Sequence, residues 1–369
     1  NYFINLVEVN PHLRVRVGNP DELSSNRMNQ TLDLLKHRVI NPEPDIAEAI
    51  DGGVITALNE EAVVSACLAN QSGLNIVVSY EAFAVKMLGA LRQAIIFSRH
   101  QTEAGDPANW LGLPVISTSH VWENGKNEQS HQDPILGEAL LGEMSDMARV
   151  VFPADANTAM VCLKYCYGDL GSVWNLIVPK SVMPLQFSPT QAEELMHNGA
   201  ICVRGNSAAP MQMVACGAYQ LEQALKASDR LLTKGIGHSV VYLLEPGRFR
   251  QPRDAFESAQ MASADVIDCV FPKSVKQRIF LTHIRPEIFL GHVRRIDLGP
   301  KATRALGYIN QGGTLDSDAM LFANKNTWAD ALSALAHMSD TPVDRWLSGA
   351  ELAAINGKGD PYSVNPYST

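Results

Sequence analysis

Short apolar, β-rich runs alternate with longer helical patterns along most of this chain of 369 residues. In the first half, the strand-like runs are residues 53–58, 75–79, 111–116, 148–152 and 173–178. Helical patterns separate them at residues 59–69, 81–98, 135–147 and 158–167. Apolar strands joined by crossover helices form parallel sheets that are covered by helices on both faces. The pattern therefore predicts an α/β protein whose first domain is doubly wound.

A cluster of Pro, Ser and Gln residues between Pro179 and Thr190 marks the predicted domain boundary. The alternation then resumes through the second half, at residues 213–218, 220–232, 239–244, 266–271, 280–282 and 328–337. The tail after Leu352 is rich in Gly, Pro, Ser and Asn, and is expected to wrap loosely. We therefore predict two doubly wound α/β domains, residues 1–185 and 186–369.

The net charge of -9 and the pI near 5.6 argue against nucleic acid or an anionic membrane as a partner. No apolar run has the length of a membrane span, and no secretory signal is recognisable. The six cysteines include no Cys-x-x-Cys pair, and Cys162 and Cys166 are expected to be buried thiols. These features predict a reduced cytoplasmic protein, and Asn1 in place of Met indicates a processed or truncated chain.

A long polar loop, residues 117–134, follows the apolar run 111–116. It carries His120, Lys126 and His131 together with several carboxylates and amides. Groups of this polarity need partners or water, and loops that follow buried strands often hold the chemistry of α/β folds. The alternative is a solvated surface loop.

Residues 20–27 indicate a turn that leads into a helix. Ser25 and Arg27 could hold a phosphate there, because free backbone amides and a guanidinium both suit an oxyanion. The alternative, which these residues alone favour, is a plain capped helix.

Glu60 and Glu61 follow an apolar run, so one of them could be a desolvated acid. The commoner alternative is that they complement a helix dipole. Tyr80 and Phe83 end the next run at a spacing that is more often typical of a core.

The order of these segments carries more information than each segment alone. The motifs are Gly18-Asn19-Pro20-Asp21-Glu22 with Ser25-Asn26-Arg27, Leu58-Asn59-Glu60, Tyr80-Glu81-Ala82-Phe83, Ser119-His120-Val121-Trp122, Ser130-His131-Gln132-Asp133-Pro134 and Pro153-Ala154-Asp155-Ala156-Asn157. In order and spacing the chain resembles the thiamine-diphosphate-dependent phosphoketolases, from about residue 12 to at least Asn324. The resemblance implies the second half of such an enzyme, a pyrimidine-binding domain followed by a transketolase-like C-terminal domain.

The resemblance implies a lyase that cleaves xylulose 5-phosphate or fructose 6-phosphate with inorganic phosphate, giving acetyl phosphate and an aldose phosphate. Thiamine diphosphate would contact this chain with its ring end. Its charged tail and Mg²⁺ would be bound by the family's N-terminal half, and no metal ligands are expected here. A partner half, cleaved from a longer chain or separate, and a dimer or higher oligomer are therefore implied.

The resemblance also implies roles for single residues. Glu60 would contact the aminopyrimidine ring and promote its imino tautomer, whereas Glu61 lies one residue past the matching position. Tyr80 and Phe83 would shape the pyrimidine pocket. The residues matched to phosphate binding are Ser25, Arg27 and Lys180. The residues matched to contacts with the reacting sugar are His120, His131 and Asn127.

The polar loop departs from the family's pattern. Phosphoketolases have Arg-Gln-Asp-His-Asn-Gly after His-Val-Trp, where residues 123–128 here read Glu-Asn-Gly-Lys-Asn-Glu. Lys126 therefore takes the place of a histidine and joins the candidate catalytic residues, although lysine is a poor base at neutral pH unless desolvated. Glu123 takes the place of an arginine. Two alternatives follow: ketol transfer of the transketolase type, and a non-catalytic assembly or regulatory subunit.

Overall fold

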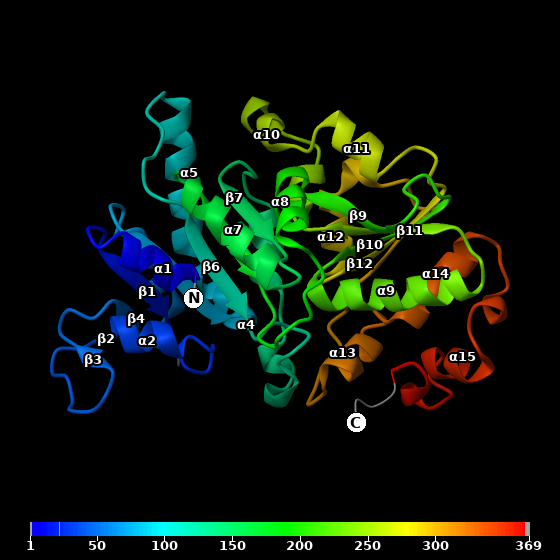
Figure 1. Ribbon diagram of the computed structural model, residues 1–369, viewed down its shortest axis with the longest axis horizontal. Coiled ribbons are helices and arrows are strands. Elements are labelled where there is room, and N and C mark those ends of the chain that lie inside the picture. The colour runs from blue at the N-terminus through cyan, green and yellow to red at the C-terminus, as the bar shows by residue number, and fades with distance from the viewer. Residues whose placement is uncertain (1, 22, 366–369) are drawn as a thin grey trace.

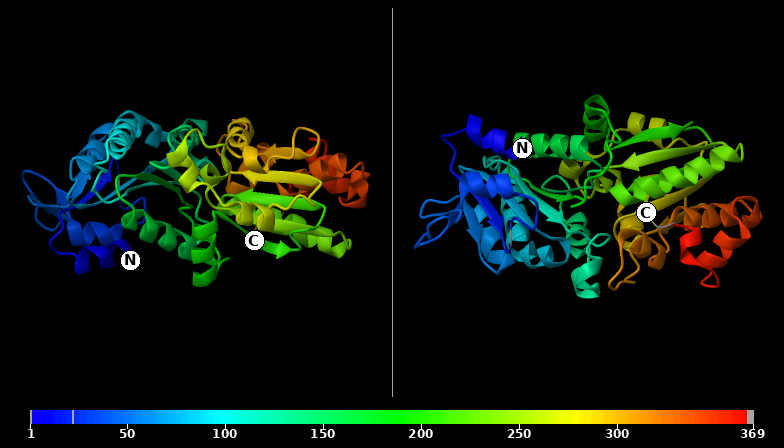
Figure 2. Two further views of the ribbon diagram at one scale, coloured as in Figure 1. Left: turned by 90° about the horizontal axis from the view of Figure 1, so that it is seen from above. Right: turned by 60° about the horizontal axis from the view of Figure 1, so that its bottom comes forward.

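The computed structural model describes residues 2–21 and 23–365, and for Lys126 it describes the backbone alone. Its strands form two sheets that lie side by side (Figure 1). Helices lie on both sides of the strands (Figure 2). The predicted fold class, two α/β domains, is confirmed.

The first sheet has eight strands in the order β3-β2-β4-β1-β5-β6-β8-β7, and its strands pair in parallel. They are β1 (Val15–Asn19), β2 (His37–Arg38), β3 (Glu48–Ala49), β4 (Val54–Thr56), β5 (Leu74–Tyr80), β6 (Leu113–Thr118), β7 (Ala148–Val151) and β8 (Val173–Ile177). Because parallel strands run in one direction, the loops that follow them meet at one edge of the sheet.

The second sheet has five strands in the order β13-β12-β10-β11-β9. They are β9 (Ala200–Gly205), β10 (Met211–Cys216), β11 (His238–Leu243), β12 (Gln277–Thr282) and β13 (Thr303–Leu306). Edge strand β9 is antiparallel to β11, and the other pairings are parallel.

The helices connect the strands as crossovers and cover the sheets. The α-helices are α1 (Tyr2–Val9), α2 (Asn29–Leu35), α3 (Glu60–Leu68), α4 (Glu81–Ala84), α5 (Leu88–Glu103), α6 (Ile135–Leu141), α7 (Ala156–Gly168), α8 (Pro189–Asn198), α9 (Ala218–Thr233), α10 (Ala255–Gln260), α11 (Ala264–Val270), α12 (Pro286–His292), α13 (Ser317–Ala323), α14 (Trp328–Met338) and α15 (Gly349–Ile355). The 3-10 segments are η1 (Val85–Met87), η2 (Gly125–Asn127), η3 (Gln129–His131), η4 (Pro246–Phe249), η5 (Arg294–Ile296), η6 (Val343–Arg345) and η7 (Pro361–Ser363). Within the described residues, no helix combines the length and the apolar character needed to cross a membrane.

Two apolar layers run through both sheets. Val150 and Val241 belong to the layer that includes side chains of α3, α5, α6, α11 and α12. Their neighbours Val151 and Val240 belong to the layer that includes side chains of α7, α8, α9 and α14. Successive residues of a strand point to opposite faces, so a strand that is covered on both faces is apolar along most of its length. Each layer continues from the first sheet into the second and thereby fixes the two sheets together.

The predicted helix 81–98 is wrong as a single element, because it is divided into α4, η1 and α5. The 3-10 turn places residues three apart on one face, and it keeps both Ala84 and Met87 buried before α5 continues the core contact at Leu91. The predicted helix 135–147 ends early, at Leu141. The apolar pattern also does not reveal β9 and β13, which are edge strands of the second sheet and only partly buried.

The expected looseness of the tail is wrong for its described part. The Trp328 indole Nε1 donates to the Val364 carbonyl at 2.9 Å, and the Val364 side chain is buried in the layer beneath α14. The Lys325 ammonium donates to the Ile355 carbonyl at 2.5 Å. A few anchors are therefore enough to hold a segment whose sequence has no helical or strand periodicity.

Asp155 ties the start of α7 to the segment between the two sheets. One carboxylate oxygen accepts from the backbone N–H of Thr158 at 2.9 Å and caps the helix. The other oxygen accepts from the backbone N–H groups of Gln186 and Phe187, at 2.8 and 2.9 Å. Helix α8 follows and contacts both α7 and β9. A domain division at residues 185 and 186 therefore stays a prediction.

A buried arginine joins the two domains on the opposite face. The Arg99 guanidinium of α5 binds the Asp146 carboxylate at 2.8 Å and the Asp254 carboxylate at 2.5 Å. Asp254 caps α10 in the second domain. The Arg99 and Asp146 side chains are 3% and 6% exposed, so the charges are compensated by each other rather than by water.

We expect Arg99→Ala to lower the free energy of unfolding by about 3–5 kcal/mol, because it leaves the buried Asp146 carboxylate without a counter-charge. Urea unfolding followed by circular dichroism measures the change. Arg92→Ala is the matched control, since Arg92 is 58% exposed in its pair with Glu143. It should cost about 1 kcal/mol at most. Equal effects of the two substitutions would contradict the role given to Arg99.

Candidate functional site

The candidate residues follow the carboxyl ends of five strands that are consecutive neighbours in the first sheet, β4-β1-β5-β6-β8. Glu60 follows β4, Ser25 and Arg27 follow β1, and Lys180 follows β8. Tyr80 is the last residue of β5 and Phe83 comes shortly after it. The loop from His120 to His131 follows β6. Open parallel sheets bind their ligands at this edge. The parallel pairing therefore gathers side chains that are far apart in the sequence.

Glu60 and Glu61 are distinguished by their position on α3. Asn59 caps the helix by accepting from the Ala62 N–H at 2.9 Å, so both glutamates lie in the first turn. Glu60 is 8% exposed, whereas Glu61 faces solvent. Consecutive helix residues point in different directions, and here only the first points inward.

A continuous set of contacts starts at Glu60. The Lys86 ammonium lies 3.4 Å from the Glu60 carboxylate and 4.9 Å from the centre of the Phe83 ring. Phe83 stacks with Tyr80, with ring centres 6.5 Å apart. A carboxylate, a cation and two aromatic rings are thus held together at the ends of β4 and β5.

Three more candidate residues join this set through the aromatic pair. The Ser25 hydroxyl is 3.2 Å from the Tyr80 hydroxyl. The His131 ring packs edge-on against Phe83 at 4.8 Å, and its Nδ1 is 2.9 Å from the Ser130 hydroxyl. The Lys180 ammonium lies over the Tyr80 ring at 5.3 Å. Six of the predicted residues are therefore connected.

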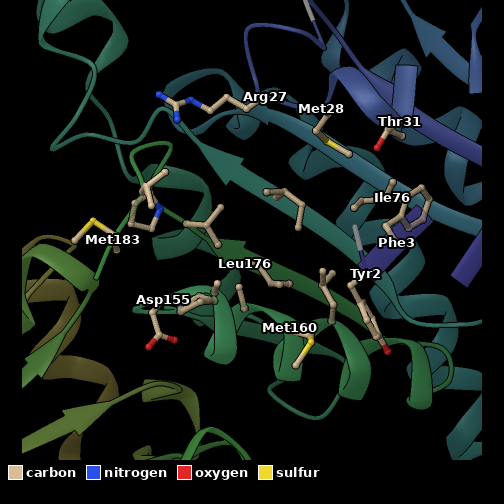
Figure 3. Close-up of a pocket in the computed structure, with 18 of the residues that line it drawn as sticks. Tyr2, Phe3, Arg27, Met28, Thr31, Ile76, Asp155, Met160, Leu176 and Met183 are labelled. Atoms are coloured by element: carbon tan, nitrogen blue, oxygen red, sulfur yellow. The ribbon is translucent and has the colours of Figure 1, made fainter. Parts of the chain in front are cut away.

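Arg27 lies two residues from Ser25 in a left-handed backbone conformation, with φ 58°. It lines a cavity of about 880 Å³ between α1, α7 and the strands beneath them. Most of the lining is apolar: Tyr2 and Met160 approach from the two helices, while the Arg27 guanidinium points away from the other side chains (Figure 3). The other predicted site residues are not among its described lining residues, but Pro179 and Ser181, on either side of Lys180, are.

His120 belongs to a second cluster, which is buried between the domains. It is 2% exposed, and its ring packs edge-on against His283 at 4.8 Å and against Tyr219 at 5.7 Å. Burial lowers the pKa of His120 below its ordinary value of 6.5, and this outweighs the opposite effect of Glu123. Within the described part of the structure, His120 Nδ1 is buried and has no hydrogen-bond partner.

Glu81 anchors this cluster from α4. Its carboxylate accepts from the Val121 N–H at 2.8 Å and lies 2.9 Å from His283 Nε2. A carboxylate can only accept, so we assign a proton to His283 Nε2. The Trp122 indole donates to the His283 carbonyl at 3.2 Å, which fixes the loop against the second sheet.

The polar loop is hydrogen-bonded to the second domain, so the alternative of a merely solvated surface loop is wrong. The Gln132 amide donates to the Gly313 carbonyl at 3.0 Å, and the Tyr308 hydroxyl donates to the Gln132 carbonyl at 2.7 Å. Asn127 remains exposed and donates to the Asn124 side chain at 3.0 Å. The backbone of Lys126 lies in η2, and its side chain lies outside the described part of the structure.

Sequence reasoning missed His283, Tyr219 and the internal role of Glu123. His283 directly follows β12, as the predicted residues of the first domain follow their strands. The same signal, a polar residue at the end of an apolar strand, could have found it. Tyr219 offers no comparable signal, because it lies within an ordinary helical pattern.

Cys162 and Cys166 are buried, as predicted, and burial raises the pKa of each thiol. Among the described residues, no group of three or more His, Cys, Asp or Glu side chains is arranged to hold a metal ion.

The solved structures that the chain resembles show its fold. A transketolase from Leishmania mexicana superposes with a TM-score of 0.69 at 16% identity, covering 94% of this chain and 45% of its own. A chain described as a split gene transketolase, inactive beta4 tetramer, gives a TM-score of 0.59 at 15% identity, covering 91% of this chain and 95% of its own. The fold is therefore transketolase-like.

The sequences identify the family that the chain resembles. Residues 1–169 match the family model of D-xylulose 5-phosphate/D-fructose 6-phosphate phosphoketolase. A probable phosphoketolase of Lactococcus lactis subsp. lactis is 26% identical over 302 residues, which cover 76% of this chain and 36% of the relative. One from Bifidobacterium animalis subsp. lactis is 24% identical over 287 residues, 72% of this chain and 34% of the relative. The predicted resemblance is confirmed, and the chain spans about a third of the length of these curated relatives.

The neutral His120 should make stability depend on pH. Below pH 6.5 the unfolded chain binds a proton that the buried imidazole does not, so the free energy of unfolding should fall as the pH drops. One such proton corresponds to about 1.4 kcal/mol per pH unit. His292, whose pKa burial lowers to about 4, adds a second contribution. Urea midpoints between pH 7 and pH 5 should therefore change less steeply in His120→Gln than in the wild type. His100→Gln, at an exposed position, is the control; an unaltered slope in His120→Gln would contradict the prediction.

Proposed function

We propose that this chain is the pyrimidine-binding and C-terminal part of a thiamine-diphosphate-dependent phosphoketolase. Its reaction would cleave xylulose 5-phosphate or fructose 6-phosphate with inorganic phosphate, giving acetyl phosphate and an aldose phosphate. The observation that carries the proposal is the buried Glu60 carboxylate beside the Phe83 and Tyr80 rings, at the sheet edge where the family's motifs fall. Residues 1–185 would form the pyrimidine-binding domain and residues 186–369 the C-terminal domain.

The residues present fit the ring end of thiamine diphosphate. An aminopyrimidine needs a desolvated carboxylate for its ring nitrogen and apolar surfaces for its faces. Glu60 is 8% exposed, and Tyr80 and Phe83 supply aromatic surface within the same set of contacts. Glu60 would hold the pyrimidine by a charge-assisted hydrogen bond and favour its imino tautomer. When bound, the cofactor supplies the electron sink for carbon–carbon cleavage.

The polar side chains around this set would bind and orient the substrate. Ser25, Arg27 and Lys180 would hold the sugar phosphate or the attacking phosphate, since two of them carry a positive charge. The residues that would contact sugar hydroxyls or hold a proton near them are His120, Lys126, Asn127 and His131. A neutral imidazole such as that of His120 can accept a proton without prior deprotonation.

A partner would supply the diphosphate site. The resemblance assigns the diphosphate and Mg²⁺ to another segment of the family, on the same polypeptide or a separate one, in a cytoplasmic dimer or larger oligomer. Leu58 and Val182, beside the site, are 89% and 87% exposed, as expected of side chains that a partner covers. The split gene transketolase chain, of which 95% is covered, supports a separate partner polypeptide.

Ketol transfer of the transketolase type is the alternative reaction, favoured by Lys126 in place of the family histidine. In that case the two-carbon unit passes to an aldose acceptor. The second alternative is a non-catalytic assembly or regulatory subunit.

A tagged chain purified with its native partners distinguishes these functions. With thiamine diphosphate, Mg²⁺, xylulose 5-phosphate and phosphate, we expect acetyl hydroxamate after hydroxylamine treatment, without an added aldose. A product that forms only when ribose 5-phosphate is added would establish ketol transfer instead. No product under either condition would favour the non-catalytic role.

Glu60→Gln should reduce turnover of the reconstituted enzyme by at least about a hundredfold, because an uncharged amide cannot favour the imino tautomer. Thermal unfolding and circular dichroism should be close to those of the wild type. Glu61→Gln makes the same charge change one residue later, at an exposed position, and should retain activity. Full activity of Glu60→Gln would remove the proposed contact.

A further inference from the structure

Glu123 is the buried residue whose contacts the resemblance does not explain, since phosphoketolases carry an arginine there. Its side chain is 6% exposed. Oε1 accepts from the Ser181 N–H and from the Tyr219 hydroxyl, each at 2.9 Å. Oε2 accepts from the Lys180 N–H at 2.6 Å and lies 3.9 Å from His120 Nε2. One carboxylate therefore contacts the loop after β6, the segment after β8 and helix α9.

We propose that Glu123 is a positioning residue that holds His120 and the main chain of Lys180 and Ser181 in register against α9 of the second domain. The inference rests on the proposed function in that it takes His120 and Lys180 as members of the site. Glu123 itself would touch neither substrate nor cofactor, because its oxygens are directed at groups of this chain.

The partners of Glu123 explain why a carboxylate stands at this position. All three hydrogen-bonding partners are donors: two backbone N–H groups and a hydroxyl. Each of these donors is satisfied by an acceptor, and an arginine side chain offers none. Burial raises the pKa of Glu123, but the backbone N–H groups of Lys180 and Ser181 lower it, so the pKa lies below its ordinary value and the charge is retained.

The anchored main chain places a cation at the site. With its backbone N–H on Glu123, Lys180 extends its ammonium over the Tyr80 ring at 5.3 Å. The Glu123 carboxylate therefore accepts hydrogen bonds from groups of this chain, while the Lys180 ammonium lies beside Tyr80 at the proposed site. This arrangement reconciles a buried glutamate with a site proposed to receive phosphate groups.

His120 has charged or titratable neighbours on every side that packs against it. They are Glu123 on its own loop, Glu81 on α4, Tyr219 on α9 and His283 after β12. Of these, Glu123 stabilises the imidazolium form most strongly, against the effect of burial. Removal of the Glu123 charge should therefore make His120 harder to protonate.

The test is NMR of the chain itself, comparing Glu123→Gln with the wild type. Histidine ring carbon shifts should show the His120 titration moved to lower pH by at least about 0.5 unit. In glutamine an NH2 group, which cannot accept a hydrogen bond, replaces one of the two carboxylate oxygens, so the Lys180 N–H or the Ser181 N–H loses its acceptor. Exchange of at least one of these two amides should be at least about tenfold faster.

Glu128→Gln is the matched control, with the same charge change in the same loop at an exposed position. It should leave both measurements as in the wild type. The inference is overturned if Glu123→Gln leaves either the His120 titration or both amide exchange rates unchanged.

If Glu123→Gln does not fold, Tyr219→Phe provides a second test of the inference. It removes the hydroxyl that shares Oε1 with the Ser181 N–H, and it should change exchange at Ser181 more than at Lys180. Equal, wild-type exchange at both amides would overturn the inference. These measurements need no turnover, so they can fail while the phosphoketolase activity stands, and the activity can fail while they succeed.

Discussion

Two apolar layers that continue from one sheet into the other hold this protein together. Because Val150 and Val151, like Val240 and Val241, contribute to opposite layers, these strands are covered on both faces by apolar side chains. Polar groups are then tolerated mainly at the strand ends. The parallel pairing of β4-β1-β5-β6-β8 directs five carboxyl ends to one edge, and the candidate site is there. The site is thus a consequence of how the core is closed.

Buried carboxylates fix loops that the apolar layers do not hold in place. Glu81, Glu123 and Asp155 each accept backbone N–H groups from segments 30 or more residues away. Charge-assisted bonds of this kind offset the cost of burying an ionised group and fix loops that have no periodic structure. Glu81 and Glu123 also flank the buried histidines. The same contacts that order the loops therefore set the electrostatic surroundings of His120.

The sequence was most informative where one physical pattern dominates. Buried strands such as β5 and β8 are mostly apolar and are predicted well, whereas the half-exposed edge strands β9 and β13 are not. A single helix was expected over residues 81–98, because periodicity does not distinguish an α-helix from one interrupted by a 3-10 turn. The composition of the tail predicts a loose segment, yet the burial of Val364 holds it in place. The choice of Glu60 over Glu61 came from the resemblance, and the inward direction of α3's first residue agrees with it.

By itself, the sequence determined the α/β class, the order of most elements and the residue types that follow each strand, since these depend on local periodicity and on motif order. Only the tertiary structure decided which of those residues meet. Ser25, the pair Tyr80 and Phe83, and His131 come from three separate segments, and their contact depends on strand order. The pairing of His120 with His283 and Tyr219 depends on how the two sheets pack. Contacts of this kind join residues far apart in the chain, and no local pattern encodes them.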